Sequence, residues 1–559
     1  MVEHDDVIPW VDGLTVGDVL RRTARVYPDR DAVVFPALGL RWSWAELDRR
    51  VDRVGSALIN LGVRPGEHVG IWSMNAPEWV VTQFAVGRIG AVLVNINPAY
   101  RLHELEETLL QADVTTLIVG LPFKTSDYVG MVESIIPEVV GMKAGAWRSA
   151  RLPELHRLIA VGDHPARGWL SWHDLESEEI STELAHRESA TRASDVFNIQ
   201  FTSGTTGMPK GAMLTHRNIL MNAYYIGQRV GYTERDRVCV PVPFYHCFGC
   251  VLGTTVCSVY GSAIVAPAPT FDAKATLIAI ESERCTAIYG VPTMFVTQLD
   301  HPDFDTFDLS SLRTGIMAGS PCPLPLMNAV VHRMGASQIT IGYGLTEASP
   351  IITQTWADDP IEVRVGTVGS AIPGVEVKLV HPITREEVPL GETGELCVRG
   401  HGVMAGYYKA PEATDKVISP DGWLATGDLA RGREDGNYRI VGRSKELIIR
   451  GGENIYPPEI EEYLCHHPSV AEVAVVGLPD PVYGEAVSAW IVARTGCSLK
   501  PEDIRAFCTG QIAHFKIPKY VEIVPHLPRT VTGKIRKHLL REQGIEQFKL
   551  SDAATTRTA

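Results

Sequence analysis

The stretch "FTSGTTGMPKGAMLTH", residues 201–216, holds four hydroxyl residues, three glycines and a lysine within ten consecutive positions. Gly204, Gly207 and Gly211 let the backbone turn successive N–H groups toward an anion, and the neighbouring hydroxyls add further donors. Lys210 adds a compact positive charge. The spacing differs from the GxxxxGK[ST] pattern of P-loop ATPases, so the sequence predicts a phosphate-binding loop of another geometry rather than a flexible linker.

The sequence on either side of this loop predicts regular structure. "DVFNIQF", residues 195–201, has the composition of a buried strand, and "LTHRNILMNAYYIGQ", residues 214–228, has the pattern of a helix. A loop held between two regular elements presents its backbone in a fixed direction, which favours ligand binding over a linker role.

Before residue 350 the chain alternates helical and strand patterns, which is typical of a doubly wound α/β fold. One predicted helix covers residues 43–62, with Ser43 and Glu46 in capping-box spacing and Gly62 at its end. The predicted strands end in glycine, proline or asparagine, where a parallel sheet presents its ligand-binding edge. They are "HVGIWSMN" (68–75), "AVLVNINP" (91–98), "TTLIVG" (115–120), "SAIVAP" (262–267), "CTAIYGVP" (285–292) and "QITIGYG" (338–344).

The pattern changes twice after about residue 360. Short strands separated by glycine turns, such as "VEVKLV" (375–380) and "GELCVRG" (394–400), indicate a small β-barrel. Residues 446–545 then have the pattern of a compact α+β unit. The small, polar tail from Ser551 is expected to be disordered.

Composition restricts the class of protein. At 559 residues the chain is long enough for two or more domains, and its net charge of -14 argues against a nucleic-acid partner. The ten cysteines lack a disulfide-like rhythm, and the close pair Cys247 and Cys250 has no second pair to complete a zinc site. Reduced thiols and an acidic N-terminus without a signal pattern predict a cytoplasmic protein.

Residues 238–271 contain no Lys, Arg, Asp or Glu and are long enough to cross a bilayer. Prolines and glycines interrupt the run, so we expect a buried strand, a buried helix and another strand rather than a transmembrane helix. The interrupting residues are Pro241, Pro243, Gly249, Gly253, Gly261, Pro267 and Pro269.

"FTSGTTGMPKG" resembles the phosphate loop of the adenylate-forming superfamily, which includes acyl-CoA synthetases, luciferases and the adenylation domains of peptide synthetases. Further motifs of that superfamily follow in the expected order, and the resemblance covers nearly the whole chain. It is closest to the medium-chain fatty acyl-CoA synthetases. The motifs are "GYGLTEASP" (342–350), "DGWLATGDLA" (421–430), "GRSKELIIRGGENIYPPEIE" (442–461) and "PRTVTGKIRK" (528–537).

The resemblance implies an α/β fold in two domains. A large N-terminal domain of two α/β sheets plus a β-barrel is expected over residues 1–444. A small, mobile α+β domain is expected over residues 445–559, with a hinge at Lys445. Many relatives carry Asp at the hinge, so Lys445 is a variation on the pattern, although a polar, exposed residue still rotates easily.

The resemblance also implies an ATP site. Glu347 is expected to bind the Mg²⁺ that bridges the ATP phosphates, with Thr346 touching the α-phosphate. Asp428 is expected to accept the ribose hydroxyls, and Arg443 to contact ribose and phosphate. The expected ATP- and AMP-binding residues are Thr202, Ser203, Gly204, Thr205, Thr206, Gly207, Lys210, Gly319, Ser320, Pro321, Gly342, Tyr343, Gly344, Thr346, Asp428, Arg443 and Lys534.

Each of these residues, taken alone, also has an ordinary structural explanation. Glu347 resembles a carboxylate at the start of a helix, where the helix dipole favours it. Asp428 resembles a turn residue and Arg443 a solvated surface charge. The family resemblance implies that Tyr343 stacks on adenine, but taken alone this residue has the character of a half-buried core aromatic. The motif context is what favours the ATP site.

Two further residues are implied to act on the substrate carboxylate. Lys534 is expected to bridge this carboxylate and the α-phosphate during adenylation, a compact charge placed where negative charge gathers. Outside the motif it would simply belong to an exposed basic segment. His246 is expected to line the acyl site, although a lone histidine in an uncharged run is more often a core residue. The expected catalytic residues are Lys534, His246, Thr346 and Glu347.

The implied reaction has two steps. A carboxylic acid and ATP give an acyl-AMP and pyrophosphate, and the thiol of coenzyme A then displaces AMP. Gly451 and Gly452 are expected to lie against the pantetheine channel, where a Cβ would obstruct it. The cofactors and co-substrates implied are ATP, Mg²⁺ and coenzyme A. The partners expected are small molecules, with a medium-chain fatty acid as the acyl substrate, while peripheral membrane contact and oligomeric state stay open.

Alternatives share parts of this pattern. A fatty acyl-AMP ligase feeding a carrier protein usually carries an extra insertion, and none is evident between residues 360 and 440. A CoA ligase for an aryl or branched acid would keep every ATP motif. An amino-acid-activating domain usually holds an acidic residue near position 246, where this chain has His246. A luciferase-like oxygenase stays open, and a non-catalytic ATP sensor would not need both Glu347 and Lys534.

Overall fold

The computed structural model describes residues 8–162, 167–202, 209–320, 322–451, 453–529 and 534–550. The chain divides into two compact units. The first comprises Met1–Glu376 with Val398–Leu424, and the second Val377–Cys397 with Ala425–Ala559. Residues 425–444 thus group with the C-terminal part of the chain, while the boundary at Lys445 stays a prediction about domain motion.

The first unit contains a nine-stranded sheet within the described residues. Its six central strands are parallel, and antiparallel strands lie at both edges. The order is β16 (Ser370–Ala371), β15 (Ile351–Gln354), β14 (Gln338–Gly344), β13 (Thr314–Ala318), β12 (Ala287–Gly290), β10 (Arg237–Cys239), β11 (Ala263–Val265), β1 (Asp31–Phe35) and β2 (Leu40–Ser43).

An eight-stranded sheet of described residues accompanies it in the same unit. Strands β8, β4, β3, β5, β6 and β7 are parallel to one another, whereas β9 and β19 form an antiparallel edge. The order is β19 (Gly406–Tyr407), β9 (Lys210–Thr215), β8 (Val196–Thr202), β4 (Val92–Ile96), β3 (His68–Trp72), β5 (Val114–Val119), β6 (Arg157–Ala160) and β7 (Leu170–Ser171).

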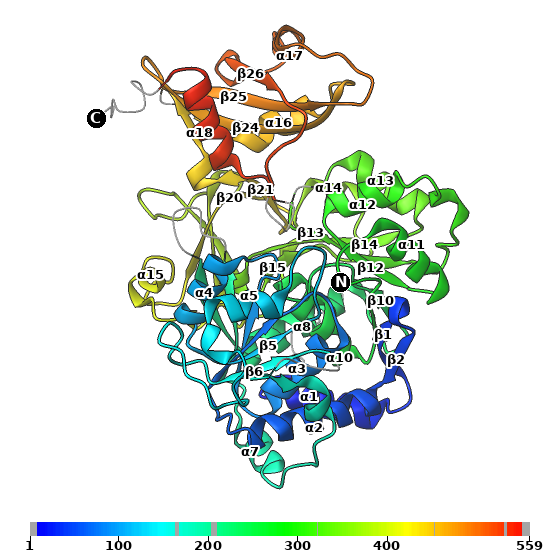
Figure 1. Ribbon diagram of the computed structural model, residues 1–559. Coiled ribbons are helices and arrows are strands. Elements are labelled where there is room, and N and C mark those ends of the chain that lie inside the picture. Colours follow the sequence, from blue (N-terminus) through cyan, green and yellow to red (C-terminus); the bar gives the residue numbers. More distant parts are fainter. Residues whose placement is uncertain are drawn as a thin grey trace. The chain divides into compact units, whose positions relative to one another are not determined.

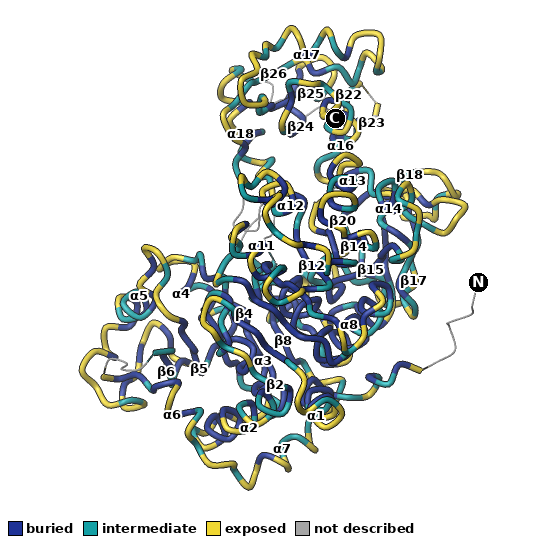
Figure 2. The backbone as a smooth tube through the Cα atoms, turned by 90° about the vertical axis from the view of Figure 1, so that its right-hand side faces the viewer, coloured by how far each residue is buried: buried dark blue, intermediate teal, exposed yellow. Residues whose placement is uncertain are grey.

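Alternate side chains of these strands enter different hydrophobic cores, because successive residues of a strand point to opposite faces. Ile71 belongs to the core between the two sheets, and its neighbour Trp72 to the core on the outer face of the eight-stranded sheet. Ile316 and Met317 divide in the same way about the nine-stranded sheet. β4 is buried along its whole length and β8 in its middle, and Figure 2 shows both strands inside the unit.

Helices cover both faces of each sheet, as a doubly wound α/β fold requires. The core between the sheets takes side chains from α1 (Val16–Val26), α2 (Trp44–Asn60), α3 (Pro77–Arg88), α8 (His216–Val230) and α10 (Val256–Tyr260). The outer faces are covered by α4 (Leu102–Gln111) and α5 (Tyr128–Ile135), and by α11 (Ala273–Ser282), α12 (Pro292–Leu299) and α13 (Leu324–Arg333). Shorter helices are α6 (Trp172–Glu176), α7 (Leu184–Ala190), α14 (Ile361–Gly366) and α15 (Pro411–Asp415).

Most of the predicted elements are confirmed. The helix expected over residues 43–62 is α2, whose N-cap Ser43 accepts a hydrogen bond from the Glu46 N–H at 3.2 Å. All six quoted strand sequences contain a strand of one of the two sheets. The uncharged run contains a strand, a helical segment and a second strand. No described helix combines the length and the apolar character needed to cross a membrane.

The two elements expected on either side of the glycine-rich loop are confirmed as β8 and α8. An additional strand that we did not predict, β9, precedes α8 and pairs antiparallel with β8. Helix α8 begins only at His216, after the N-cap Thr215, whose side chain accepts from the Asn218 N–H. Thr202 and Lys210, which lie on either side of residues 203–208, are opposite each other in the ladder.

The second unit has two sheets of its own among the described residues. Where a barrel was expected, a four-stranded sheet has the order β17 (Val375–Val380), β18 (Thr393–Gly400), β20 (Leu424–Gly432) and β21 (Tyr438–Arg443). The C-terminal α+β unit has β23 (Glu453–Ile455), β22 (Ile448–Arg450), β25 (Gly484–Ala493) and β24 (Val470–Asp480), with β26 (Tyr520–Ile523) also paired to β25. Its helices are α16 (Pro457–Leu464), α17 (Pro501–Cys508) and α18 (Lys537–Gln547). The α+β unit expected in this part of the chain is therefore confirmed.

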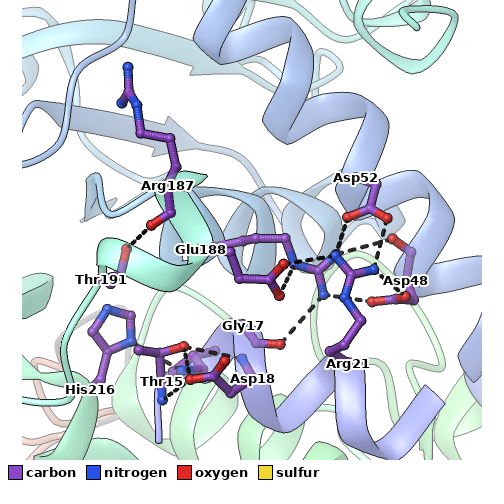
Figure 3. A network of polar contacts seen from close by, with 12 residues as sticks. Thr15, Gly17, Asp18, Arg21, Asp48, Asp52, Arg187, Glu188, Thr191 and His216 are labelled. Atoms are coloured by element: carbon purple, nitrogen blue, oxygen red, sulfur yellow. Dashed lines mark hydrogen bonds and ion pairs between the residues drawn. The ribbon is translucent and has the colours of Figure 1, made fainter. Parts of the chain in front are cut away.

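A cluster of charged residues ties together helices α1, α2, α3 and α7 of the first unit (Figure 3). Arg88 on α3 has a fully buried side chain and contacts Asp48 and Asp52 at 2.6 Å each. Arg21 on α1 contacts the same two carboxylates at 2.7 Å and Glu188 at 3.1 Å. Burial opposes ionisation of Asp52, but the two arginines outweigh it and lower its pKa. The carboxylates therefore depend on both guanidinium groups.

Replacing Arg88 with methionine is predicted to lower the free energy of unfolding of the first unit by roughly 3–5 kcal/mol, because the partly buried carboxylates of Asp48 and Asp52 lose a fully buried partner. The matched control is Arg49→Met on α2, where the arginine is 61% exposed and pairs with Glu46. It is expected to cost less than about 1 kcal/mol. Calorimetric unfolding of both variants measures the difference, and equal costs would contradict the prediction.

Candidate active site

The hairpin that carries the glycine-rich loop positions the first two site residues. Thr202 is the last residue of β8 and Lys210 the first of β9, and the Thr202 hydroxyl donates to the Lys210 carbonyl at 3.4 Å. The pairing holds both ends of the loop at one sheet edge. The other predicted loop residues, Ser203, Gly204, Thr205, Thr206 and Gly207, lie outside the described residues.

Parallel strands β13 and β14 bring the expected adenine-binding segments to one edge of the nine-stranded sheet. Ala318 and Gly342 are partners in the ladder, so the residues that follow each strand lie near each other. Gly319 has a φ of +90°, and Ser320 is exposed, while Pro321 lies outside the described residues. Tyr343 is half-buried. At Gly344 a Cβ would lie 1.8 Å from the Pro350 carbonyl oxygen, so only glycine fits this backbone approach.

Thr346 and Glu347 follow β14 in a single 3₁₀ turn, Thr346–Ala348. The Glu347 backbone carbonyl accepts from the Met404 N–H at 2.9 Å. Its carboxylate atom Oε1 accepts from the hydroxyl of Tyr407 at 2.7 Å. Two separate contacts with one neighbouring segment thus fix the position of this carboxylate.

Tyr407 is a site residue that the sequence reasoning missed. Strand β19 pairs antiparallel with β9, with Tyr407 opposite Ala212. The Lys210 ammonium lies 5.2 Å from the centroid of the Tyr407 ring, within cation–π range. Burial and the nearby Glu347 carboxylate raise the pKa of the Tyr407 phenol well above 10, so the hydroxyl stays a donor. Tyr407 therefore connects Lys210 with Glu347.

His246 is linked to Thr346 by its neighbour Cys247, whose sulfur contacts both residues. The His246 ring caps the short helix α9 (Cys247–Gly249), where its Nδ1 accepts from the Phe248 N–H at 3.1 Å. The Cys247 Sγ is 3.5 Å from His246 Nδ1 and 3.8 Å from the Thr346 hydroxyl. A neutral His246 that accepts at Nδ1 carries its proton at Nε2, which leaves that nitrogen as a donor.

The segment that carries His246 is anchored to the sheet by buried amides. The Asn95 side chain on β4 donates to the Tyr245 carbonyl at 3.0 Å and contacts the Cys250 sulfur at 3.5 Å. Asn198 on β8 donates to the Asn95 side-chain oxygen at 2.9 Å, and Gln200 donates to the Cys250 sulfur at 3.2 Å. This ladder of polar groups fixes residues 245–250 against the strands.

A π-helix, Cys250–Thr255, continues this segment. Its first carbonyl, that of Cys250, accepts from Gln83 at 3.0 Å and from the hydroxyls of Thr254 and Thr255 at 2.7 Å each. Three side-chain donors therefore converge on one buried backbone oxygen at the start of the π-helix. π-Helical turns are frequent at functional sites.

In the second unit the ribose-binding candidates form a cross-strand pair. Asp428 on β20 and Arg443 on β21 are partners in an antiparallel ladder, and Arg443 Nε lies 3.1 Å from Asp428 Oδ1. The Asp428 side chain is 12% exposed and that of Arg443 48%. Their proximity fits residues that share one ligand.

The remaining predicted residues of the second unit lie in turns and an exposed segment. Lys445 lies in a 3₁₀ turn, Ser444–Glu446, directly after β21. Gly451 has a φ of +60° in the hairpin between β22 and β23, which favours glycine, while Gly452 lies outside the described residues. Lys534 is exposed.

The donors present fit Mg²⁺ held jointly with a polyphosphate. Among the described residues, no group of three or more His, Cys, Asp or Glu side chains is arranged to hold a metal ion. Mg²⁺ is commonly bound through one or two carboxylates together with substrate phosphates rather than in an all-protein cage. A single, well-positioned Glu347 beside Lys210 and Tyr407 matches that pattern.

Two family models match this chain. The AMP-binding enzyme model covers residues 20–408, and the AMP-binding enzyme C-terminal domain model covers residues 459–534. The chain is 49% identical over 542 residues to the putative acyl-CoA synthetase YngI of Bacillus subtilis (strain 168), covering 96% of this chain and 98% of that protein.

A second relative and a solved structure agree with these matches. The chain is 43% identical over 541 residues to the mitochondrial medium-chain acyl-CoA ligase ACSF2 of Danio rerio, covering 96% of this chain and 89% of that protein. The crystal structure of the anthranilate CoA ligase AuaEII with anthranoyl-AMP is 29% identical, with a TM-score of 0.86 and coverage of 98% and 99%. The chain therefore belongs to the AMP-binding enzyme family.

Proposed function

We propose that this protein is an ATP-dependent, AMP-forming acyl-CoA ligase. The observation that carries the proposal is that Lys210, Glu347 and His246, from three distant segments of an AMP-binding enzyme, lie in one connected site. In the first step a carboxylate oxygen attacks the α-phosphorus of ATP and pyrophosphate leaves. In the second step the thiol of coenzyme A attacks the acyl carbon and AMP leaves.

The first step brings two anionic groups together, so catalysis depends on positioning and charge neutralisation. Lys210 supplies a positive charge at the phosphate loop, and Thr346 offers a hydroxyl to the α-phosphate. Glu347 would hold the Mg²⁺, which supplies charge neutralisation on the phosphates when bound. Lys534, from the second unit, is proposed to complete the site for adenylation. Asp428 and Arg443 are proposed to hold the ribose.

The acyl group is proposed to lie along the uncharged segment that begins at His246. Phe248, Val251 and Leu252 on this segment are buried, and an apolar wall suits an alkyl chain. His246 is proposed to hydrogen-bond the substrate carboxylate as it enters. The relative of 43% identity is named a medium-chain ligase, which supports a medium-chain fatty acid as the substrate.

An aryl acid is the second candidate substrate, because the crystal structure of similar fold is that of an anthranilate CoA ligase. Its identity of 29% is well below the 43% shared with the medium-chain ligase, so the fatty acid is favoured. Assaying a panel of linear, branched and aryl acids with ATP and coenzyme A tests the choice. The highest kcat/KM on an aryl acid would overturn the fatty-acid assignment.

The second step is proposed to need rotation at Lys445, which brings Gly451 and Gly452 to the pantetheine of coenzyme A.

We also propose a cytoplasmic location. All ten cysteines lie among the described residues and none forms a disulfide, which supports a reducing compartment.

Glu347→Gln is predicted to lower acyl-AMP formation by about a hundredfold, because the amide keeps the shape of the side chain but loses the charge that holds a hard cation. Excess Mg²⁺ should restore the rate only in part. Pyrophosphate release measured across Mg²⁺ concentrations tests this, with Glu362→Gln, an exposed residue of the same unit, as the control. Near-normal turnover at low Mg²⁺ would remove Glu347 from the metal site.

Lys445→Pro is predicted to leave acyl-AMP formation largely intact while suppressing thioester formation, because proline fixes φ and the hinge must turn. Lys445→Ala, which leaves φ free, should support both steps. The two half-reactions are followed separately, as pyrophosphate release and as acyl-CoA formed from synthetic acyl-AMP. A parallel decline of both steps in the proline variant would locate the hinge elsewhere.

Lys534→Ala is predicted to suppress acyl-AMP formation while leaving thioester formation intact, which is the opposite of the effect expected for Lys445→Pro. Loss of a preorganised charge typically costs roughly 2.7–4 kcal/mol, or about a hundred- to thousandfold in rate, and adenylation should fall by that amount. Thioester formation from synthetic acyl-AMP should survive. Lys549→Ala, at another exposed lysine of the same unit, is the control. An unimpaired first step in the Lys534 variant would refute the assignment, and equal losses in both steps would indicate a folding defect.

A further inference from the structure

Tyr407 is placed by backbone contacts that do not involve its hydroxyl. Strand β19 pairs with β9, and the neighbouring Tyr408 N–H donates to the Gly211 carbonyl at 2.8 Å. The Tyr407 N–H donates to the Thr414 hydroxyl at 2.9 Å. The residue is 8% exposed. Its ring is therefore held in place before any interaction with Glu347 is considered.

The ring faces two groups of the nucleotide site at once. Its face lies near the Lys210 ammonium, and its hydroxyl donates to Glu347 Oε1. The second carboxylate oxygen, Oε2, is not used by this hydrogen bond. The hydrogen bond directs the hydroxyl of a ring held by its backbone at one oxygen of the carboxylate.

The orientation of this carboxylate matters because Mg²⁺ requires near-ideal octahedral geometry. A glutamate on a single 3₁₀ turn has side-chain torsions that neighbouring helical turns do not restrict. A hydrogen bond to one oxygen selects one rotamer and leaves the other oxygen for the cation. Groups that orient metal ligands in this way typically contribute 10- to 100-fold to metal affinity.

We propose that Tyr407 is a positioning residue for Mg²⁺–ATP, acting by orienting the Glu347 carboxylate. This inference rests on the proposed function, in which Glu347 holds the metal. Tyr407 touches neither substrate nor metal in this assignment. Its effect should appear in the Mg²⁺ dependence of nucleotide binding, which a purely structural role would leave unchanged.

The chain offers a matched control in the next residue. The Tyr408 hydroxyl donates to Asp113 Oδ2 at 2.7 Å, so it too forms a phenol–carboxylate hydrogen bond. Lys409 pairs with the same carboxylate, and the Tyr408 ring packs edge-on against His68. Tyr408→Phe removes the same chemical group from the same segment without touching Glu347.

The experiment measures ATP binding by isothermal titration calorimetry at a series of free Mg²⁺ concentrations. Tyr407→Phe keeps the ring over Lys210 and removes only the hydroxyl. We expect the Mg²⁺ concentration for half-maximal ATP binding to rise about tenfold or more in this variant. Tyr408→Phe should match the unmutated protein. In a Glu347→Gln background, Tyr407→Phe should add little further shift, because the oriented group has already been changed.

The outcomes separate the two assignments. An unchanged Mg²⁺ dependence in Tyr407→Phe, with normal acyl-CoA formation by the unmutated protein, overturns the role of Tyr407 alone. Loss of ATP binding by the same factor at every Mg²⁺ concentration also overturns it, since that result indicates a structural defect. Absence of Mg²⁺-dependent ATP binding and of acyl-CoA formation in the unmutated protein overturns the proposed function and this inference together.

Discussion

The pairing of β19 with β9 is the constraint on which the candidate site in the first unit depends. It brings residues near 407 beside the strand that leaves the glycine-rich loop, although about two hundred residues separate them in the chain. The same segment then holds the 3₁₀ turn with Glu347, through the Met404 N–H at its backbone and the Tyr407 hydroxyl at its side chain. Without this short strand, Lys210 and Glu347 would have no common neighbour in the contacts described.

The attraction of anionic substrates to this site depends on nearby cations rather than on the net charge of the protein. The whole chain carries a net charge of -14, yet its proposed substrates, ATP and a carboxylate, are anions. Attraction at long range therefore contributes little, and individual cations must act at short distance, where Coulomb interactions are strongest. Lys210 serves this purpose at the phosphate loop, and its contact with the Tyr407 ring limits the directions in which its ammonium can point.

Elements whose signals lie within their own residues can be predicted from the sequence. Elements that form only because a distant strand pairs with them are missed. Helix α2 and strands such as β3 have caps, periodicity or apolar runs within their own residues, so they could be predicted. Strand β9 has the sequence "KGAMLT", with no clear alternation, and is a strand because β8 and β19 pair with it. Tyr407 lies in a two-residue strand and has no motif that indicates its role. Its contact with Glu347 depends on sheet register, which single-sequence patterns do not encode.

The proposed acyl wall, residues 246–261, has a backbone held by buried polar side chains. Its backbone is fixed by amides from β4 and β8 and by Gln83 on α3, all of which bond to carbonyls or to the Cys250 sulfur. Buried polar networks of this kind resist small displacements, because each unsatisfied group is costly. Under the proposed function, the side chains along residues 246–261 would set the acyl preference, while the backbone path of the π-helix is held in place.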